Sequence, residues 1–163
     1  MSTTNVLRTP RRLSALVGAL SAAALLSGCS SVGRVDFRCV SPSSQINGGL
    51  LLTVDVIRAT PDEARRVQEM GEKWFYAQDR FNMRDKVQTV TFPAAENSTQ
   101  CDRLVEVTPP KQKGERTLVI IADYKYQNPD TTKHIIVVPD KKWMGQTIRV
   151  SVEERELRAT LNY

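Results

Sequence analysis

The sequence has 163 residues, of which 40% are hydrophobic and 25% are charged, and its formal net charge is +5. This length fits one domain of ordinary size, and the composition is that of a globular protein rather than of a disordered chain. Apart from one N-terminal stretch, no part of the sequence is apolar enough to enter a membrane, which excludes a protein with several membrane spans. A single histidine gives multi-histidine metal sites and Ser-His-Asp catalysis few residues to use.

The N-terminal segment predicts a secretory signal. Arg8, Arg11 and Arg12 precede an uncharged apolar run over residues 13–26, and this run is shorter than the roughly 20 residues that a membrane-spanning helix needs. Removing residues 1–28 would take away these three arginines and no acid, so the net charge would fall from +5 to +2. The remaining basic residues are interspersed with acids, so we expect no nucleic-acid partner.

The end of the apolar run indicates lipidation. Leu26-Ser27-Gly28-Cys29 resembles the bacterial lipobox, which predicts cleavage of residues 1–28 and three acyl chains on Cys29. Each buried methylene contributes about 0.8 kcal/mol, so three chains form a stable membrane anchor. Ser30 follows the cysteine in place of Asp, which in the lipoprotein sorting rule favours the periplasmic face of the outer membrane. The alternative is an ordinary secretory signal in which Cys29 has no role.

Two further cysteines, Cys39 and Cys101, lie in the remaining chain. In an oxidising periplasm such a pair predicts a disulfide. Closing a loop of this length would stabilise the fold by about 4 kcal/mol in the chain-entropy model. The alternative is two separate buried thiols.

We expect residues 29–34 to form a tether and residues 35–163 to form a mainly β domain. A first strand over 35–39 has apolar residues alternating with charged ones, which indicates one buried face. Segment 41–49 has the composition of a loop, with Pro, Ser, Asn and Gly residues. Segment 50–57 predicts the second strand, and its residues on one face are Leu50, Leu52, Val54 and Val56.

A helical insertion is expected after the second strand. Thr60 can cap a helix, Pro61 suits its first turn, and Glu63 completes a capping box. Gly71 would break or end this helix. Segment 73–86 predicts a second short helix or an irregular arm on a sheet edge, and its aromatic residues are more typical of a local core than of a ligand platform.

Strands then return to the end of the chain. Segment 117–124 is the most continuous apolar run and predicts a central strand covered on both faces. Trp143 is expected in an exposed loop. Seven or so short strands with frequent turns predict an antiparallel two-sheet sandwich with a short helical insertion; the later strands are expected over 87–92, 104–107, 117–124, 133–138 and 146–157.

The sequence contains no familiar catalytic, nucleotide-binding or metal-binding motif. His134 lies among apolar residues, which favours a structural role. Glu153, Glu154 and Glu156 could supply paired carboxylates for glycoside chemistry, but acids that flank Arg155 are more typical of a solvated surface. We therefore expect no catalytic residue, no metal and no cofactor, and a role in binding rather than catalysis.

The order of these features resembles that of TssJ, the family of outer-membrane lipoproteins in type VI secretion systems. The resemblance begins with the lipobox and tether and covers about residues 35–157. It includes the helical insertion and three strands, namely Leu52–Ile57, Leu118–Tyr124 and Thr147–Val152. The pair Cys39 and Cys101 and the long polar stretch 94–116 depart from the family pattern.

The resemblance implies a transthyretin-like sandwich that tethers the secretion membrane complex to the outer membrane. The implied partner is the periplasmic C-terminal domain of TssM, which would contact the loop between the first two strands. Here that loop is 41–49, with Gln45, Ile46 and Asn47 at its exposed middle, followed by Gly48. The alternative is that this loop is only a connector.

Two other functions remain open from the sequence. The chain could be another envelope sandwich lipoprotein, either an assembly accessory or a module that binds a glycan or peptide through Trp74, Phe75, Tyr76 and Trp143. It could also be a periplasmic hydrolase that uses the acids of segment 153–156. The hydrolase would require a deep cleft that holds two of these carboxylates.

Overall fold

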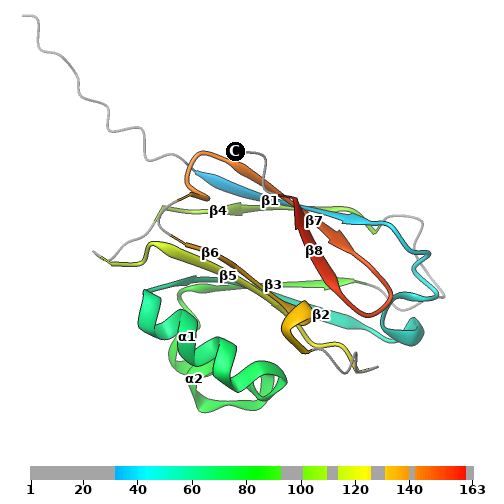
Figure 1. The fold of residues 1–163 in the computed structure, drawn as a ribbon, viewed down its shortest axis with the longest axis horizontal. Helices are drawn as coiled ribbons and strands as arrows, with labels where there is room; N and C mark the ends of the chain where they lie inside the picture. The colour runs from blue at the N-terminus through cyan, green and yellow to red at the C-terminus, as the bar shows by residue number, and fades with distance from the viewer. Residues whose placement is uncertain (1–31, 93–100, 110–113, 126–130, 140–141, 161–163) are drawn as a thin grey trace, which may run out of the picture.

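The computed structural model describes residues 32–92, 101–109, 114–125, 131–139 and 142–160 (Figure 1). The expected signal 1–28 and the expected lipidation site Cys29 lie outside these residues. No helix in the described part of the chain is both long and apolar enough to span a membrane.

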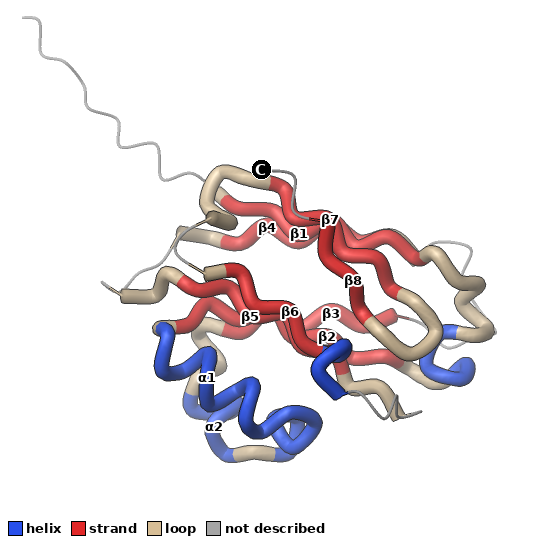
Figure 2. The backbone as a smooth tube through the Cα atoms, in the orientation of Figure 1, coloured by secondary structure: helices blue, strands red, loops and turns tan. Residues whose placement is uncertain are grey.

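The described residues form a sandwich of two four-stranded sheets (Figure 2). The first sheet has the order β4-β1-β7-β8, with β4 at Arg103–Val107, β1 at Gly33–Cys39, β7 at Thr147–Val152 and β8 at Leu157–Thr160. The second sheet has the order β3-β2-β5-β6, with β3 at Val87–Phe92, β2 at Leu52–Ala59, β5 at Thr117–Ala122 and β6 at Ile135–Val138. The prediction of a mainly β, two-sheet sandwich is confirmed.

One strand pair departs from the antiparallel prediction. β1 runs parallel to β7, in a register that pairs Arg34 with Thr147 and Cys39 with Val152, whereas the other strand pairs are antiparallel. A parallel pair needs a long connection. Here the chain forms β4 and all four strands of the second sheet between β1 and β7, so neighbouring segments carry no sign of this pairing.

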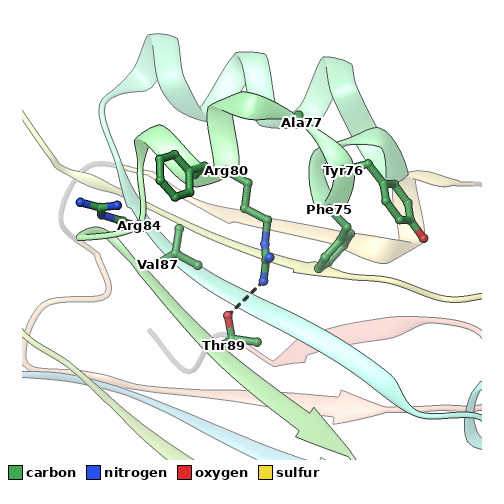
Figure 3. A pocket seen from close by; sticks show the side chains of 8 residues that line it. Phe75, Tyr76, Ala77, Arg80, Arg84, Val87 and Thr89 are labelled. Atoms are coloured by element: carbon green, nitrogen blue, oxygen red, sulfur yellow. Dashed lines mark hydrogen bonds between the residues drawn. The ribbon is translucent and has the colours of Figure 1, made fainter.

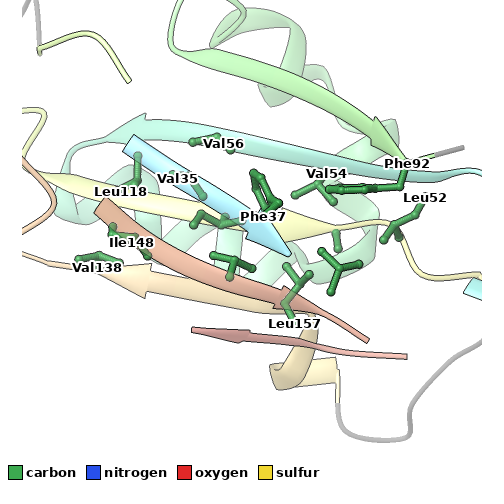
Figure 4. Close-up of a cluster of buried hydrophobic side chains, with 14 of the residues drawn as sticks. Val35, Phe37, Leu52, Val54, Val56, Phe92, Leu118, Val138, Ile148 and Leu157 are labelled. Atoms are coloured by element: carbon green, nitrogen blue, oxygen red, sulfur yellow. The ribbon is translucent and has the colours of Figure 1, made fainter. Parts of the chain in front are cut away.

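The main core lies between the two sheets (Figure 4). Phe37 from the first sheet packs edge-on against Phe92 from the second, with ring centroids 5.6 Å apart. Every residue of β5 is buried. Leu118 and Ile120 belong to this core, while Val119 and Ile121 belong to a second core under the helices, so the predicted central strand covered on both faces is confirmed.

The helical insertion after β2 covers the outer face of the second sheet (Figure 1). It consists of α1 at Pro61–Met70, the 3₁₀ helix η2 at Gly71–Tyr76 and α2 at Gln78–Asn82. Thr60 and Glu63 form the predicted capping box, in which the Thr60 N–H donates to Glu63 Oε2 at 2.9 Å. Gly71, with φ of +54°, ends α1, and its backbone N–H donates to the Val67 carbonyl.

Several element boundaries differ from the sequence prediction. β2 begins at Leu52, and Leu50 is half exposed instead of sharing the buried face. The expected tether overlaps β1, because β1 already begins at Gly33. Segment 133–138 divides into the 3₁₀ helix η3 at Thr131–His134 and β6, and segment 146–157 contains the turn between β7 and the unpredicted β8.

Trp143 is buried, and the expectation of an exposed Trp143 is wrong. Its Nε1–H donates to the Arg116 carbonyl at 3.0 Å, and its ring belongs to the main core. A Cβ on Gly33 would lie 2.6 Å from the Trp143 carbonyl oxygen, so the start of β1 requires glycine here. Burial of the large indole outweighs the polar composition of its loop.

Candidate partner-binding site

The loop between β1 and β2 lies at the far end of the sandwich from the start of β1 (Figure 1). β1 has seven residues, and a strand of that length spans about 20 Å. Gly33, next to the N-terminal segment, and Cys39, next to the loop, therefore mark opposite ends of the fold.

The loop contains the 3₁₀ helix η1 at Ile46–Gly49. Ile46 and Asn47 are both buried, so the expectation that they form the exposed middle of the loop is wrong. Ile46 is part of the main core. The composition of segment 41–49 correctly indicates a loop, but an isolated isoleucine in such a loop is free to turn inward, and burying it is favourable by about 1.5–3 kcal/mol.

Asn47 fastens the loop to two other segments. Its backbone N–H donates to the Glu154 carbonyl at 2.8 Å, and its side-chain Oδ1 accepts from the Lys125 N–H at 2.6 Å. Its Nδ2 donates to the Leu51 carbonyl at 2.9 Å. Asn47 has φ of +52°, a left-handed conformation that Asn tolerates better than most residues. The loop is therefore held in one shape by Lys125, which follows β5, and by the turn between β7 and β8.

The side chains that the loop region exposes differ in part from those expected. Gln45 and Gly48 are exposed, as expected. Val40, Leu50 and Leu51 are 60%, 49% and 52% exposed, and they are three of the seven exposed large hydrophobic residues in the described part of the chain. We call Val40, Gln45, Gly48, Leu50 and Leu51 the loop patch. Exposed apolar side chains at the base of a loop that also exposes polar residues are typical of a protein-binding surface.

Sequence reasoning missed the three apolar members of the loop patch. The signal was present at residues 50–52, where three consecutive leucines exceed what a strand with one buried face can bury. The sequence pattern places Leu50 on the buried face of the predicted strand 50–57 and therefore does not identify it as exposed. Val40 carried no comparable signal, because a single apolar residue after a strand is common.

A disulfide lies at the start of the loop. The structure joins Cys39 and Cys101, with Cα atoms 5.7 Å apart, as the sequence predicts. The Cys39 N–H also donates to Asp102 Oδ1 at 3.3 Å, and Asp102 pairs with Arg38 at 2.7 Å. The end of β1 is thereby linked to the residues just before β4, which fixes one base of the loop.

The turn between β7 and β8 fixes the other side. The Tyr124 hydroxyl, whose pKa is raised mainly by burial, lies 3.0 Å from the Glu153 carbonyl oxygen and 2.8 Å from that of Glu156. His134 is buried against the Tyr124 ring, with centroids 4.9 Å apart, and its Nε2 lies 3.0 Å from the Arg155 carbonyl oxygen. The geometry is consistent with the structural role expected for His134.

Two acids of this turn, Glu153 and Glu156, form ion pairs. Arg158 contacts both Glu153 and Glu156, and Lys133 lies 3.2 Å from Glu156. The hydrogen bond from Arg158 lowers the pKa of Glu156 more than burial raises it. Glu154 is exposed, as expected, but Glu156 is only 8% exposed, so the expectation of a solvated surface is wrong for Glu156, whose burial is compensated by its ion pairs. Among the described residues, no group of three or more His, Cys, Asp or Glu side chains could hold a metal.

The four aromatic residues considered as a ligand patch do not come together. Trp74 and Trp143 are both fully buried, in different cores. Phe75 and Tyr76 lie apart from Trp143, on a groove of the helical insertion. The proposed four-residue aromatic patch is therefore wrong.

Solved structures share this fold. No protein-family model matches the chain, and no curated protein matches its sequence. One structural match is described as the T6SS protein TssM C-terminal domain (869-1107) from EAEC, with a TM-score of 0.59, 9% identity, and coverage of 80% of this chain and 98% of the matched one. A match described as a type VI membrane complex has a TM-score of 0.59 and 12% identity, and covers 82% of this chain and 98% of the other.

A third match is the T6SS lipoprotein TssJ1 from Pseudomonas aeruginosa, with a TM-score of 0.57, 11% identity, and coverage of 82% of this chain and 98% of TssJ1. At these identities the likeness establishes the fold. The resemblance to TssJ seen in the sequence is thus confirmed at the level of the fold, and this chain has the fold of a type VI secretion lipoprotein.

Proposed function

We propose that this protein is a lipid-anchored outer-membrane lipoprotein that tethers the membrane complex of a type VI secretion system through protein–protein binding. The single observation that carries the proposal is the placement of the loop patch at the end of β1 opposite the N-terminal segment. The shared fold with TssJ1 and with a type VI membrane complex supports the same role. In this proposal the protein binds a partner and does not catalyse a reaction.

The anchor is Cys29, after removal of residues 1–28. β1 begins at Gly33, so residues 30–32 alone separate Cys29 from the sandwich. The four Cα–Cα steps from Cys29 to Gly33 span at most about 14 Å. It keeps the start of β1 close to the periplasmic face of the outer membrane, while the loop patch projects into the periplasm.

The partner is the periplasmic domain of a TssM-like protein. The description of one matched structure names the C-terminal domain of TssM, which supports this choice of partner. The exposed members of the loop patch would make the contact, and Ile46 and Asn47 would act by holding the loop in shape. Because the loop is already ordered by the Asn47 contacts, binding costs little conformational entropy.

A paired-variant pull-down tests the partner site. The double variant Leu50→Glu/Leu51→Glu places two charges in the loop patch, and we expect it to lose capture of the TssM-like periplasmic domain. Leu104→Glu is the matched control, because Leu104 is 60% exposed on β4, where it pairs with Asp36 in the middle of β1, and its variant should bind normally. Undiminished capture by the Leu50/Leu51 variant, with Leu104→Glu also normal, would overturn the loop assignment.

The anchor has its own test. Cells fed radiolabelled palmitate should label the wild-type protein and not Cys29→Ser, and Cys29→Ser should leave the membrane fraction. Detection of folded Cys29→Ser in the soluble fraction confirms that the variant is stable. Label on Cys29→Ser equal to that on the wild type would contradict the lipid anchor while leaving the partner site untouched.

A further inference from the structure

A groove of about 380 Å³ lies between the helical insertion and β3 (Figure 3). Its walls come from η2 and α2 and include Phe75, Tyr76 and Phe81, while Val87 and Thr89 of β3 form its floor. Val87 and Thr89 are two residues apart and therefore share one face of the sheet. The groove lies in a different part of the fold from the loop patch, so an inference from it is independent of the proposed function.

Each aromatic ring of the groove is paired with a cation. The guanidinium of Arg80 lies 5.7 Å from the centroid of Phe75, and that of Arg84 lies 4.9 Å from the centroid of Phe81. Lys125 Nζ lies 5.2 Å from the centroid of Tyr76. Two of these rings nevertheless face solvent, since Tyr76 is 75% exposed and Phe81 is 60% exposed, while Phe75 is partly buried. Cations held beside exposed rings present flat apolar surface and positive charge together.

The charge of the groove is uncompensated at one position. Arg80 is neutralised by Asp55, and Lys125 by Asp123. Arg84 forms no ion pair with any residue that the structure describes, and no acid is among the lining residues. The groove therefore offers one positive charge to an anionic partner.

The strand that forms the floor of the groove is also an unprotected edge of its sheet. β3 is the outer strand of the second sheet, so one side of its backbone has no strand partner among the described residues. Edge strands are normally protected by charged residues, by proline or by being short. β4 and β8 carry charged residues and β6 has four residues, but β3 has six residues with neither a charge nor a proline.

We propose that this groove binds an extended acidic segment of a protein partner, which adds to the edge of β3 as a further strand. Backbone hydrogen bonds to β3 would supply affinity, a carboxylate of the segment would bind the guanidinium of Arg84, and an apolar side chain would lie against the rings of Phe75 and Phe81. Charge complementarity and the bare edge of β3 both favour an extended acidic chain over a helix or a nucleic acid.

A peptide that alternates Thr with Phe and Glu (Thr-Phe-Thr-Glu, repeated twice and labelled with fluorescein) is the probe, because its Phe and Glu side chains share one face. We expect the purified full-length chain in detergent to bind it with a measurable anisotropy change at concentrations up to about 1 mM. The same peptide with Gln in place of Glu should bind about tenfold more weakly, because a charge-assisted hydrogen bond is lost. Equal binding of the two peptides would overturn the role of charge.

Variants of the protein locate the contact. Arg84→Glu should weaken binding of the Glu peptide by about tenfold or more. Arg149→Glu, an exposed arginine on β7 of the other sheet, should bind it as the wild type does. Arg84 is exposed, so both variants should unfold at the wild-type temperature. Wild-type affinity in Arg84→Glu would place the peptide elsewhere and reject the groove.

Methylation of the peptide backbone tests strand addition. A strand that pairs along one edge directs alternate N–H groups toward β3 and the others away from it. Methylating the Thr nitrogens in one peptide, and the Phe and Glu nitrogens in another, should abolish binding in one case and preserve it in the other. If both methylated peptides bind as the parent does, the segment does not add to β3 and the proposal fails.

Discussion

The carboxylate of Asp55, in the middle of β2, accepts a hydrogen bond from Trp74 Nε1 at a distance of 2.9 Å, and both residues are fully buried. The same carboxylate contacts Arg80 Nε at 2.7 Å and Thr89 Oγ1 at 2.7 Å. One buried charge thus connects η2, α2 and β3, and it holds the helical insertion on the second sheet. Buried polar networks of this kind are stabilising only while every member is satisfied.

Replacing Asp55 should be strongly destabilising. Asp55→Ala leaves Arg80 without its counter-ion and the Trp74 N–H without an acceptor, so we expect the free energy of unfolding to fall by about 3–5 kcal/mol. Guanidinium chloride unfolding followed by tryptophan fluorescence measures this loss. Thr89→Val removes one partner of the same carboxylate and should cost about 1 kcal/mol. Losses of similar size for the two variants would contradict a central role for Asp55.

Substitution of Asn47 should loosen the loop. Asn47→Ala removes two side-chain hydrogen bonds and places a less tolerant residue at positive φ, so we expect a loss of about 2–3 kcal/mol in unfolding free energy. Asn47→Gly keeps the backbone conformation and should lose less. Amide exchange at Lys125 should accelerate in both variants, since its N–H donates to Asn47 Oδ1. Unchanged exchange at Lys125 would show that Asn47 does not fasten the loop.

The capping box of α1 should make stability depend on pH. Burial raises the pKa of Glu63, but hydrogen bonds from the Thr60 N–H and Lys86 outweigh it and hold this pKa below its ordinary value of 4.5. A carboxyl whose folded pKa is lowered stabilises the fold above its unfolded pKa, and this contribution is lost as the pH falls through the folded pKa.

Glu63→Gln should therefore be less stable than the wild type at pH 7, and the difference should shrink below a pH of about 4.5. Thermal unfolding from pH 7 to pH 3 measures this difference. Asp62→Asn removes a neighbouring exposed acid of the first turn and is the matched control, for which we expect a smaller loss of stability at pH 7. A gap between wild type and Glu63→Gln that stays constant across this range would rule out the linkage.

Loss of the disulfide should destabilise the whole fold. For the 62-residue separation between Cys39 and Cys101, the double variant Cys39→Ser/Cys101→Ser should lose about 4 kcal/mol of unfolding free energy in the chain-entropy model. Denaturant unfolding with and without a reducing agent measures it, and the reductant should lower only the stability of the wild type. A double variant as stable as the oxidised wild type would contradict the prediction.

The sequence predicts those features of the fold that depend on neighbouring residues. The alternation around Phe37, the apolar run of β5 and the capping box of Thr60 and Glu63 all follow from local spacing, and the structure confirms them. The disulfide was predictable because the chain offers two cysteines besides Cys29.

The features that sequence reasoning missed depend on distant contacts. The parallel pairing of β1 with β7 joins two strands that are far apart in the sequence, since the strands of the second sheet lie between them along the chain. The burial of Trp143 depends on the absence of a side chain at Gly33. In the candidate site, Ile46 and Asn47 turn inward because β5 and the β7–β8 turn offer them contacts. Local composition identifies the loop but cannot say which of its side chains face a partner.

The position of β1 in its sheet has a mechanical consequence. β1 lies between β4 and β7. In the proposed function, one end of β1 would be next to the lipid anchor and the other end next to the loop that binds the partner. Tension between the bilayer and a partner seated on the loop would run along the axis of this strand. Such a load pulls on the hydrogen bonds of both flanking ladders in shear, all at once rather than one after another, so the strand is suited to bear force without peeling away from its sheet.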